Sequence, residues 1–371
     1  MNPSGKWTGP GTPLPVRSPQ KDAVRPRPGR QGLLLLAGLA AVAVTALLGV
    51  AWGSLSIPPA TVAAMFWRRA VGEVAAVPWP AVWETVVFDI RLPRVILAAL
   101  VGGALSQAGA VYQGLFRNPL ADPYLIGISS GAGLGATIAI ALGLPLRWGG
   151  LGAVPLLAFV GALGATTLVY ILSRTDGRPS VTTLLLAGVA LGAFLSSLTT
   201  FLMFHTKDAF QTMHIFGWLM GSFALSNWAK VWMLGPALAV GGALLRAYAH
   251  RLNVLQLDDE QAQQLGIPVE RTRLVLIVAA SLVTATAVAV SGVIGFVGLI
   301  VPHAVRLIWG PDHRFLLPMS VLTGAIFMIL ADGLARSLLS PTELPVGVVT
   351  AFCGAPFFLY LLRRQRKYVH S

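Results

Sequence analysis

Few side chains of this sequence could carry chemistry inside the apolar segments that make up most of it. Asp332 is the only acid deep within an apolar run, and an ionisable residue at such a place is a functional candidate by default. Arg336 follows four residues later, at the spacing that places two side chains on one face of a helix. A paired structural acid near the outer end of its helix is therefore the preferred interpretation.

The residues that could bind a metal are too scattered to form a site. His303 and His313 lie near Asp312 but make no three-ligand constellation, and Cys353 is the only cysteine, which excludes a cysteine-based site and an internal disulfide. The only acidic cluster, 258–260, lies in an amphipathic segment rather than in a polar cavity where Mg²⁺ would hold a diphosphate. We expect no metal in this chain, and a membrane enzyme is disfavoured.

The sequence also contains no G-x-x-x-x-G-K-[ST] phosphate loop, so the chain does not hydrolyse ATP by that route. If it belongs to an active pump, the motor is another polypeptide. An ion-coupled secondary transporter is the alternative, and such proteins usually couple ions through intramembrane carboxylates or unwound helices. One peripheral acid gives that alternative little support.

A polar island, residues 250–273, is the most informative segment, because the chain around it is apolar enough to lie in lipid. Its leucines have helical spacing around the acidic run, and Gly266 and Pro268 break the pattern, which predicts two short helices with a sharp turn between them. An amphipathic charged segment on a membrane protein is expected to meet a soluble partner. An ordinary solvated connector is the alternative.

The composition predicts an all-α, polytopic membrane protein. Hydrophobic residues make up 55% and charged residues 11% of the 371 residues, whereas soluble domains are about a quarter charged. The mean hydropathy is +0.73. The net charge of +13 does not indicate a nucleic-acid partner, because the basic residues lie at the ends of apolar runs and not on one solvated face.

A helix needs about 20 apolar residues to cross the hydrocarbon core. The uncharged stretch 274–302 is too long for one crossing, and Ser291–Gly292 is the natural place for a tight turn between two short antiparallel spans. This gives ten expected spans, at residues 33–52, 95–115, 125–144, 151–172, 183–204, 231–249, 274–290, 293–309, 315–335 and 346–362.

Ten spans place both termini on one side, and nineteen of the 27 Lys and Arg residues then share that side with the polar island, which the positive-inside rule makes cytoplasmic. Residues 1–30 are rich in proline and glycine and are expected to be a disordered basic tail. Residues 31–364 form a single transmembrane domain, and residues 365–371 a cytoplasmic C-terminal tail. The first span is too long for a cleaved secretory signal, so it is expected to be retained in the cell membrane.

Small residues recur at the spacing that lets helices pack closely in lipid. The expected role of these pairs is structural: Gly131 with Gly135, Gly188 with Gly192, and Gly217 with Gly221.

Several stretches, taken together and in order, resemble the FecCD-type permease family, the membrane subunits of ABC importers for cobalamin, haem and iron-siderophore complexes. They cover nearly everything from about residue 33 to 364. The matching stretches are RLPR at 91–94, QGLFRNPLADPYLIGISSGAG at 113–133, LLLAGVALG at 184–192, the polar island, the segment 292–318 and the segment 343–362.

The resemblance implies a ten-helix permease of the type II importer fold. Such a permease pairs with itself, receives a metal-chelate type substrate from an extracytoplasmic binding protein, and binds two cytoplasmic subunits that hold ATP and Mg²⁺. It would itself have no catalytic activity and no cofactor. No aromatic or histidine pattern separates haem, cobalamin and ferric siderophores as its substrate.

Individual roles follow from the same resemblance. The polar island is similar to the coupling helices, with Asp258, Asp259, Glu260, Gly266 and Arg271 facing the ATPase. The cytoplasmic gate is expected at Asn118, Leu120, Ser180, Thr182 and Thr183. The outer arginines expected to dock the binding protein are Arg91, Arg94 and Arg336, for which interfacial snorkelling, or pairing with Asp332 in the case of Arg336, is the alternative.

Overall fold

The computed structural model describes residues 28–53, 55–72, 78–175, 178–179, 181–206 and 208–369. The expected N-terminal tail therefore lies almost wholly outside the described residues, and so does Ser180. The described chain is almost entirely helical, as the composition predicted, apart from two short hairpins: β1 (Arg147–Trp148) pairs with β2 (Leu151–Gly152), and β3 (Arg174–Thr175) with β4 (Arg178–Pro179).

Ten helices correspond to the ten expected spans. Seven helical segments of the described residues are long and apolar enough to cross a membrane, and α5, α13 and the apolar part of α15 are shorter. The ten are α1 (Pro28–Ala51), α4 (Leu92–Leu115), α5 (Ile128–Ala141), α6 (Ala153–Leu172), α7 (Val181–His205), α9 (Trp228–Ala247), α12 (Val269–Ser291), α13 (Val297–Trp309), α14 (His313–Ser337) and α15 (Val346–Val369).

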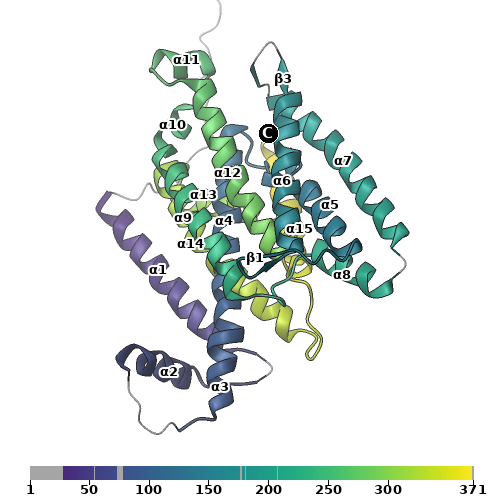
Figure 1. Cartoon of the computed structure of the whole chain (residues 1–371). Helices are drawn as coiled ribbons and strands as arrows, with labels where there is room; N and C mark the ends of the chain where they lie inside the picture. The colour runs from purple at the N-terminus through teal and green to yellow at the C-terminus, as the bar shows by residue number, and fades with distance from the viewer. Residues whose placement is uncertain are drawn as a thin grey trace, which may run out of the picture.

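Shorter helices lie at the ends of the bundle (Figure 1). α2 (Pro59–Val71) and α3 (Ala81–Thr85), the latter continued by a π-helical stretch (Val86–Arg91), lie at one end, and α10 (Ala249–Val254) and α11 (Asp259–Gln264) at the other. α8 (Ala209–Leu219) follows α7. Figure 1 shows α1 running toward the α2 end and the chain finishing on the α11 side. α15 continues to Val369, so residues 365–369 of the expected C-terminal tail are helical.

α4 is the centre of the bundle and packs against α9, α12, α13 and α14. Nearly all of its side chains are buried. Small residues make this possible, because a Cβ atom at Gly102 would collide with the Gly324 carbonyl of α14, and one at Gly109 with the Gly298 carbonyl of α13. The predicted packing role of the glycine pairs is confirmed where α5 meets α6, since Gly131 there faces the backbone of Gly161. Gly217 is an exception, with open space around it.

Two helices extend only part of the way through the bundle. α13 has 13 residues, about 20 Å, and follows α12 after a turn at Gly292, whose φ is +74°. The turn predicted at Ser291–Gly292 is thus present, but α12 is a full-length helix of 23 residues, so the prediction of two short spans is wrong for α12. The other partial helix is α5, preceded by a short 3₁₀ helix, Pro123–Ile126.

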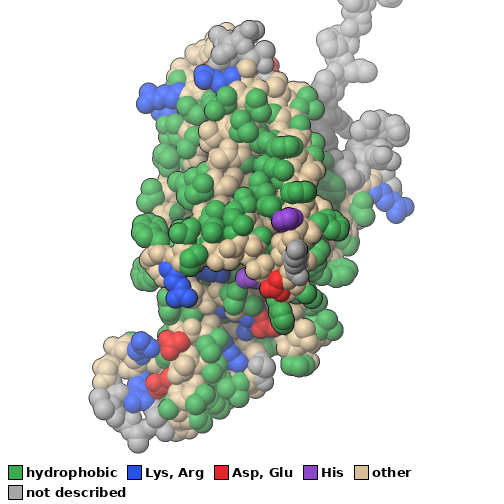
Figure 2. Space-filling model, turned by 45° about the vertical axis from the view of Figure 1, so that its right-hand side comes forward, with side chains coloured by type: hydrophobic (Ala, Val, Ile, Leu, Met, Phe, Trp, Pro, Cys, Tyr) green, Lys and Arg blue, Asp and Glu red, His purple; other side chains and the backbone are tan. Residues whose placement is uncertain are grey.

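The starts of the two partial helices meet inside the bundle. The Tyr124 hydroxyl donates to the Ile294 carbonyl at 2.9 Å, and the ring of Pro123 lies against Gly298 near the start of α13. Residues 116–127 therefore fold back into the bundle between α4 and α5. The space-filling view in Figure 2 shows hydrophobic side chains over the middle of the visible face, with Lys and Arg toward its two ends, as expected for a body that spans a membrane.

Candidate functional site

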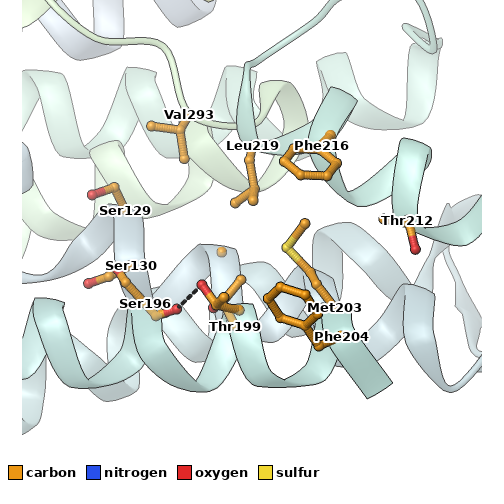
Figure 3. Close-up of a pocket in the computed structure, with 12 residues that line it drawn as sticks. Ser129, Ser130, Ser196, Thr199, Met203, Phe204, Thr212, Phe216, Leu219 and Val293 are labelled. Carbon is orange, nitrogen blue, oxygen red and sulfur yellow. Dashed lines mark hydrogen bonds between the residues drawn. The ribbon is translucent and has the colours of Figure 1, made fainter. Parts of the chain in front are cut away.

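A cavity of about 570 Å³ opens between α5, α7 and α8. Its walls are apolar side chains alternating with hydroxyls, and no charged side chain lines it among the described residues. Figure 3 shows the α7 side chains on one side and Leu219, Phe216 and Val293 facing them. The lining residues are Ser129, Ser130, Gly133, Ser196, Thr199, Thr200, Met203, Phe204, Thr212, Phe216, Leu219 and Val293.

Most of the hydroxyls in this cavity donate to the backbone of their own helix. Thr199 Oγ1 donates to Leu195 O at 2.9 Å and Thr200 Oγ1 to Ser196 O at 3.0 Å, and Ser130 and Thr212 make equivalent bonds three and four residues back. A hydroxyl has one proton and two lone pairs, so these four groups offer the cavity acceptors and no donor. The cavity is therefore weakly polar, uncharged and short of donors.

A second cavity of about 580 Å³ continues the first, sharing Leu219 and Val293, and reaches α15. Large apolar side chains around both cavities are exposed on the single chain. Phe204 is 89% exposed, Phe210 87% and Phe352 76%. Contiguous exposed apolar surface of this kind marks a face that another protein or lipid covers.

The polar island forms a cap at one end of the bundle, built by α10, α11 and the start of α12. Gly266, with φ +78°, turns the chain between α11 and the long α12. The turn predicted at Gly266 is confirmed, since it separates α11 from α12. The helix predicted before it is divided into α10 and α11 by residues 255–258, and the helix after it is long and not short.

Arg117, just after α4, holds the cap onto the bundle. Its Nε donates to Leu255 O and its Nη2 to Asp259 Oδ1, both at 2.8 Å, and Asp258 lies 3.7 Å from its Nη1. Arg273 of α12 pairs with the same Asp259 oxygen, also at 2.8 Å. Asp259 thus joins α11 to Arg117 and to Arg273 of α12, a role that the sequence pattern did not reveal.

The outward surface of the cap is suited to a protein partner. Leu257 and Leu265 are 43% and 62% exposed, and the Asp258 side chain is 81% exposed between them. Glu260 and Arg271 are also exposed, while Ala262 is buried against the bundle. Exposed leucines rimmed by charge on an ordered short helix are typical of a docking surface and favour that interpretation over a solvated connector.

A second polar network joins α10 to the start of α14. Asn253 Nδ2 donates to Asp312 Oδ1 at 2.7 Å, and Asn253 Oδ1 accepts from His313 N–H at 2.9 Å. In spite of partial burial, the hydrogen bonds that the Asp312 carboxylate accepts from Arg314 N–H and from Asn253 hold the pKa of Asp312 below its usual value. Among the described residues no group of three His, Cys, Asp or Glu side chains comes together. Pro302 and His303 lie inside α13.

The predicted gate residues lie at the cap end of the bundle in two places. Asn118 is exposed, and its Oδ1 accepts from Leu120 N–H at 2.9 Å, an Asx turn beside Pro119. Thr182 is exposed and Thr183 half-buried in the first turn of α7. The gate assignment stays a prediction.

Asp122, four residues further on, was not singled out from the sequence, although Asp-Pro is a common turn signal. Its side chain accepts from Tyr124 N–H at 2.8 Å. The Tyr124 hydroxyl in turn donates to Ile294 O at 2.9 Å, so this segment is joined to the start of α13.

The Asp332–Arg336 pair predicted from spacing is confirmed, with Nε to Oδ2 at 3.1 Å. The structure adds a second arginine that the spacing could not reveal: Arg94 of α4 donates to Asp332 at 2.9 Å and to Glu343 at 3.0 Å. Arg94 and Asp332 are buried, whereas the Glu343 side chain is 39% exposed. Asp332 therefore pairs with arginines of two different helices, Arg94 of α4 and Arg336 of α14.

Arg91 is also buried, and its guanidinium donates to the carbonyls of Val50, Ala51 and Leu55. Arg336 similarly donates to Trp52 O at 2.8 Å. The three arginines predicted to dock a binding protein thus all hold backbone or carboxylate groups of this chain, and docking would require them to exchange those partners. Docking of a binding protein by these arginines stays a prediction, with the added requirement that they leave their present partners.

Comparison with known proteins agrees with this architecture. The profile of the FecCD transport family matches residues 40–364. The cobalamin import system permease of Halobacterium salinarum is 49% identical over 285 residues, 76% of this chain and 75% of that protein. The hemin transport system permease of Yersinia pestis is 43% identical over 298 residues, 77% of this chain and 85% of that protein.

A solved structure extends the likeness to the fold. A metal-chelate type ABC transporter in an inward-facing conformation superimposes with a TM-score of 0.78 and 33% sequence identity. The match covers 90% of this chain and 99% of that one. The bundle with its partial helices and its cap is therefore the fold of such transporters' membrane chains.

Proposed function

The chain belongs to the FecCD transport family, and we propose that it is the membrane-spanning permease subunit of a binding-protein-dependent ABC importer of type II. The cap carries this proposal. It is an ordered, charged docking surface on a chain without a phosphate loop, as expected when the motor is a separate cytoplasmic subunit. The chain would sit in the cell membrane with its cap and both termini in the cytoplasm.

The working unit is a homodimer with two ATPase subunits, which hold ATP and Mg²⁺. The open apolar face of α7, α8 and α15 supports the pairing, because a second copy would cover it and close the two cavities into a shared pathway. ATP binding draws the motor subunits together, and their movement enters α11 through its exposed surface. The permease makes and breaks no covalent bond.

The cargo is a metal chelate such as cobalamin, haem or a ferric siderophore. The cavity supports this class because apolar walls with scattered acceptors fit the mixed surface of a large organic chelate. It offers no charged group that would hold a small ion. Weak contact is an advantage for a carrier, since a ligand bound equally well in every state is not moved by a conformational change.

Asn118, Leu120, Ser180, Thr182 and Thr183 close the cytoplasmic end of the pathway in this proposal. At the other end an extracytoplasmic binding protein delivers the cargo. Arg91, Arg94 and Arg336 would receive its carboxylates by exchanging present partners, and Glu343 is the partner nearest to solvent. Guanidinium groups suit this exchange because they hold carboxylates in a bidentate manner.

Uptake into proteoliposomes tests the function. The chain is reconstituted with its ATPase and binding protein, and import of labelled cyanocobalamin, haemin and a ferric siderophore is followed with ATP inside the vesicles. We expect uptake of one of these cargoes that stops when the phosphate-loop lysine of the ATPase is replaced. Uptake driven by a proton or sodium gradient in the absence of the ATPase would instead establish the secondary-transporter alternative.

A further inference from the structure

α4 ends in a backbone conformation that normally selects glycine. Arg117 N–H donates to Gly114 O and Asn118 N–H to Gln113 O, the paired bonds of a Schellman ending. Arg117 occupies the left-handed position of this motif, with φ +48°, and the only other non-glycine residue with positive φ among the described residues is Phe296. An arginine where glycine fits better indicates that its side chain is required there.

The Arg117 side chain reaches the cap. Its guanidinium contacts Leu255 O, Asp259 and Asp258, so it touches both the turn after α10 and the start of α11. Arg273 also holds Asp259, but from α12, the helix that α11 leads into. Arg117 is therefore the ion-pair connection between α11 and α4 among the described residues.

The backbone of Arg117 leads directly into the predicted gate. Asn118 is its neighbour, and the Asn118 side chain shapes the turn to Leu120. We propose that Arg117 is a positioning residue that ties the motor-facing helix α11 to the gate segment Asn118–Leu120. A displacement of α11 pulls on the guanidinium, and the strained backbone of Arg117 passes that displacement to Asn118. This inference rests on the proposed function.

Hydrogen exchange on the purified full chain in lipid nanodiscs tests the connection without any transport. Arg117→Gln and Asp259→Asn remove its two ends, and Arg246→Gln removes an exposed charge elsewhere on the same side. The first two variants should each raise amide exchange at residues 117, 118, 120 and 121 by about threefold or more, and the control should not. Unchanged exchange in Arg117→Gln or Asp259→Asn, with the α6 amides protected as in wild type, overturns the proposal.

Transport coupling tests the consequence. Arg117→Gly suits the left-handed backbone, so α4 ends as before while the connection is lost. We expect ATP hydrolysis to continue and the cargo imported per ATP to fall about fivefold, with partial recovery in Arg117→Lys. A wild-type coupling ratio in Arg117→Gly overturns the proposal. If wild type and Arg246→Gln show no ATP-driven import, the proposed function fails, while the exchange measurement still decides whether Arg117 connects α11 to the gate segment.

Discussion

Asp332 is a charge held inside an apolar bundle by two arginines, one from its own helix and one from α4. Removing one partner of a buried ion pair costs far more than an exposed pair contributes, because the remaining charge has lost its neutralisation. In this cluster the remaining charges would be two guanidinium groups and one partly exposed carboxylate, that of Glu343. Asp332 therefore has a structural role, which is to hold α14 against α4.

Asp332→Asn should lower the free energy of unfolding by about 3–5 kcal/mol. Thermal unfolding in detergent measures this, with Asp208→Asn as the control, because Asp208 caps α8 and asparagine caps as well as aspartate. A variant that kept wild-type stability but lost uptake would contradict the structural role and assign ion coupling to Asp332.

Two opposing contributions to the free energy of unfolding meet at Arg117, and they are of similar size. A side chain in the left-handed position costs about 1 kcal/mol relative to glycine, and each exposed ion pair contributes about 0–1 kcal/mol. The two nearly cancel, so stability alone does not explain the arginine. This favours a role in transmitting movement over a role in holding the fold.

At the scale of helices, the apolar length of each segment predicted which spans exist. It did not predict where α5 and α12 begin, because residues 125–127, counted as part of a span, belong to a 3₁₀ helix and the turn after it, and α12 starts with a charged turn at Glu270. Hydropathy measures how long a segment can stay in lipid, and not whether its backbone is helical throughout.

The cap was predictable because its polarity contrasts with everything around it. The cavity was not, although a signal existed: Ser196, Thr199, Thr200 and Met203 recur at helical spacing along one face of α7. The Arg94–Asp332 pair joins residues 238 apart in sequence, so only the packed bundle reveals it. Local spacing found the partner on the same helix and missed the one across the bundle.

Gly266 allows a direct test of the cap. A Cβ atom there would have open space, but φ +78° is strained for a β-branched residue, so Gly266→Val should distort the turn into α12. We expect weaker co-purification of the ATPase and lower transport-coupled hydrolysis, with Gly266→Asn less affected. Gly164→Val, an equally open glycine on α6, is the control. Wild-type co-purification and wild-type coupled hydrolysis in Gly266→Val would show that the cap is not the contact for the ATPase.

At the scale of the whole molecule, the face formed by α7, α8 and α15 is incomplete. Large phenylalanines project from it and two cavities open onto it, so a lone chain would offer lipid an irregular, partly polar surface. A two-fold partner would enclose the hydroxyls and bring the cap ends of both chains together.

The gate prediction belongs to this assembly. Single cysteines at Asn118 or Thr182, in a background with Cys353 replaced, should crosslink across the dimer to different extents in the presence and absence of nucleotide. A cysteine at half-buried Thr45 of α1 provides the control and should not crosslink. If neither gate position crosslinks in any nucleotide state, the constriction lies elsewhere.

The self-satisfied hydroxyls of α7 also determine how the cavity is hydrated. Water in the cavity would meet the hydroxyl oxygens of Thr199 and Thr200, whose protons are already bonded to the helix backbone. Few groups would then hold a water molecule in place, and displacing it would cost little free energy. A passing molecule then gains little from any particular arrangement of its own polar groups. In the proposed importer, cargo would therefore be selected before entry, at the binding protein that delivers it.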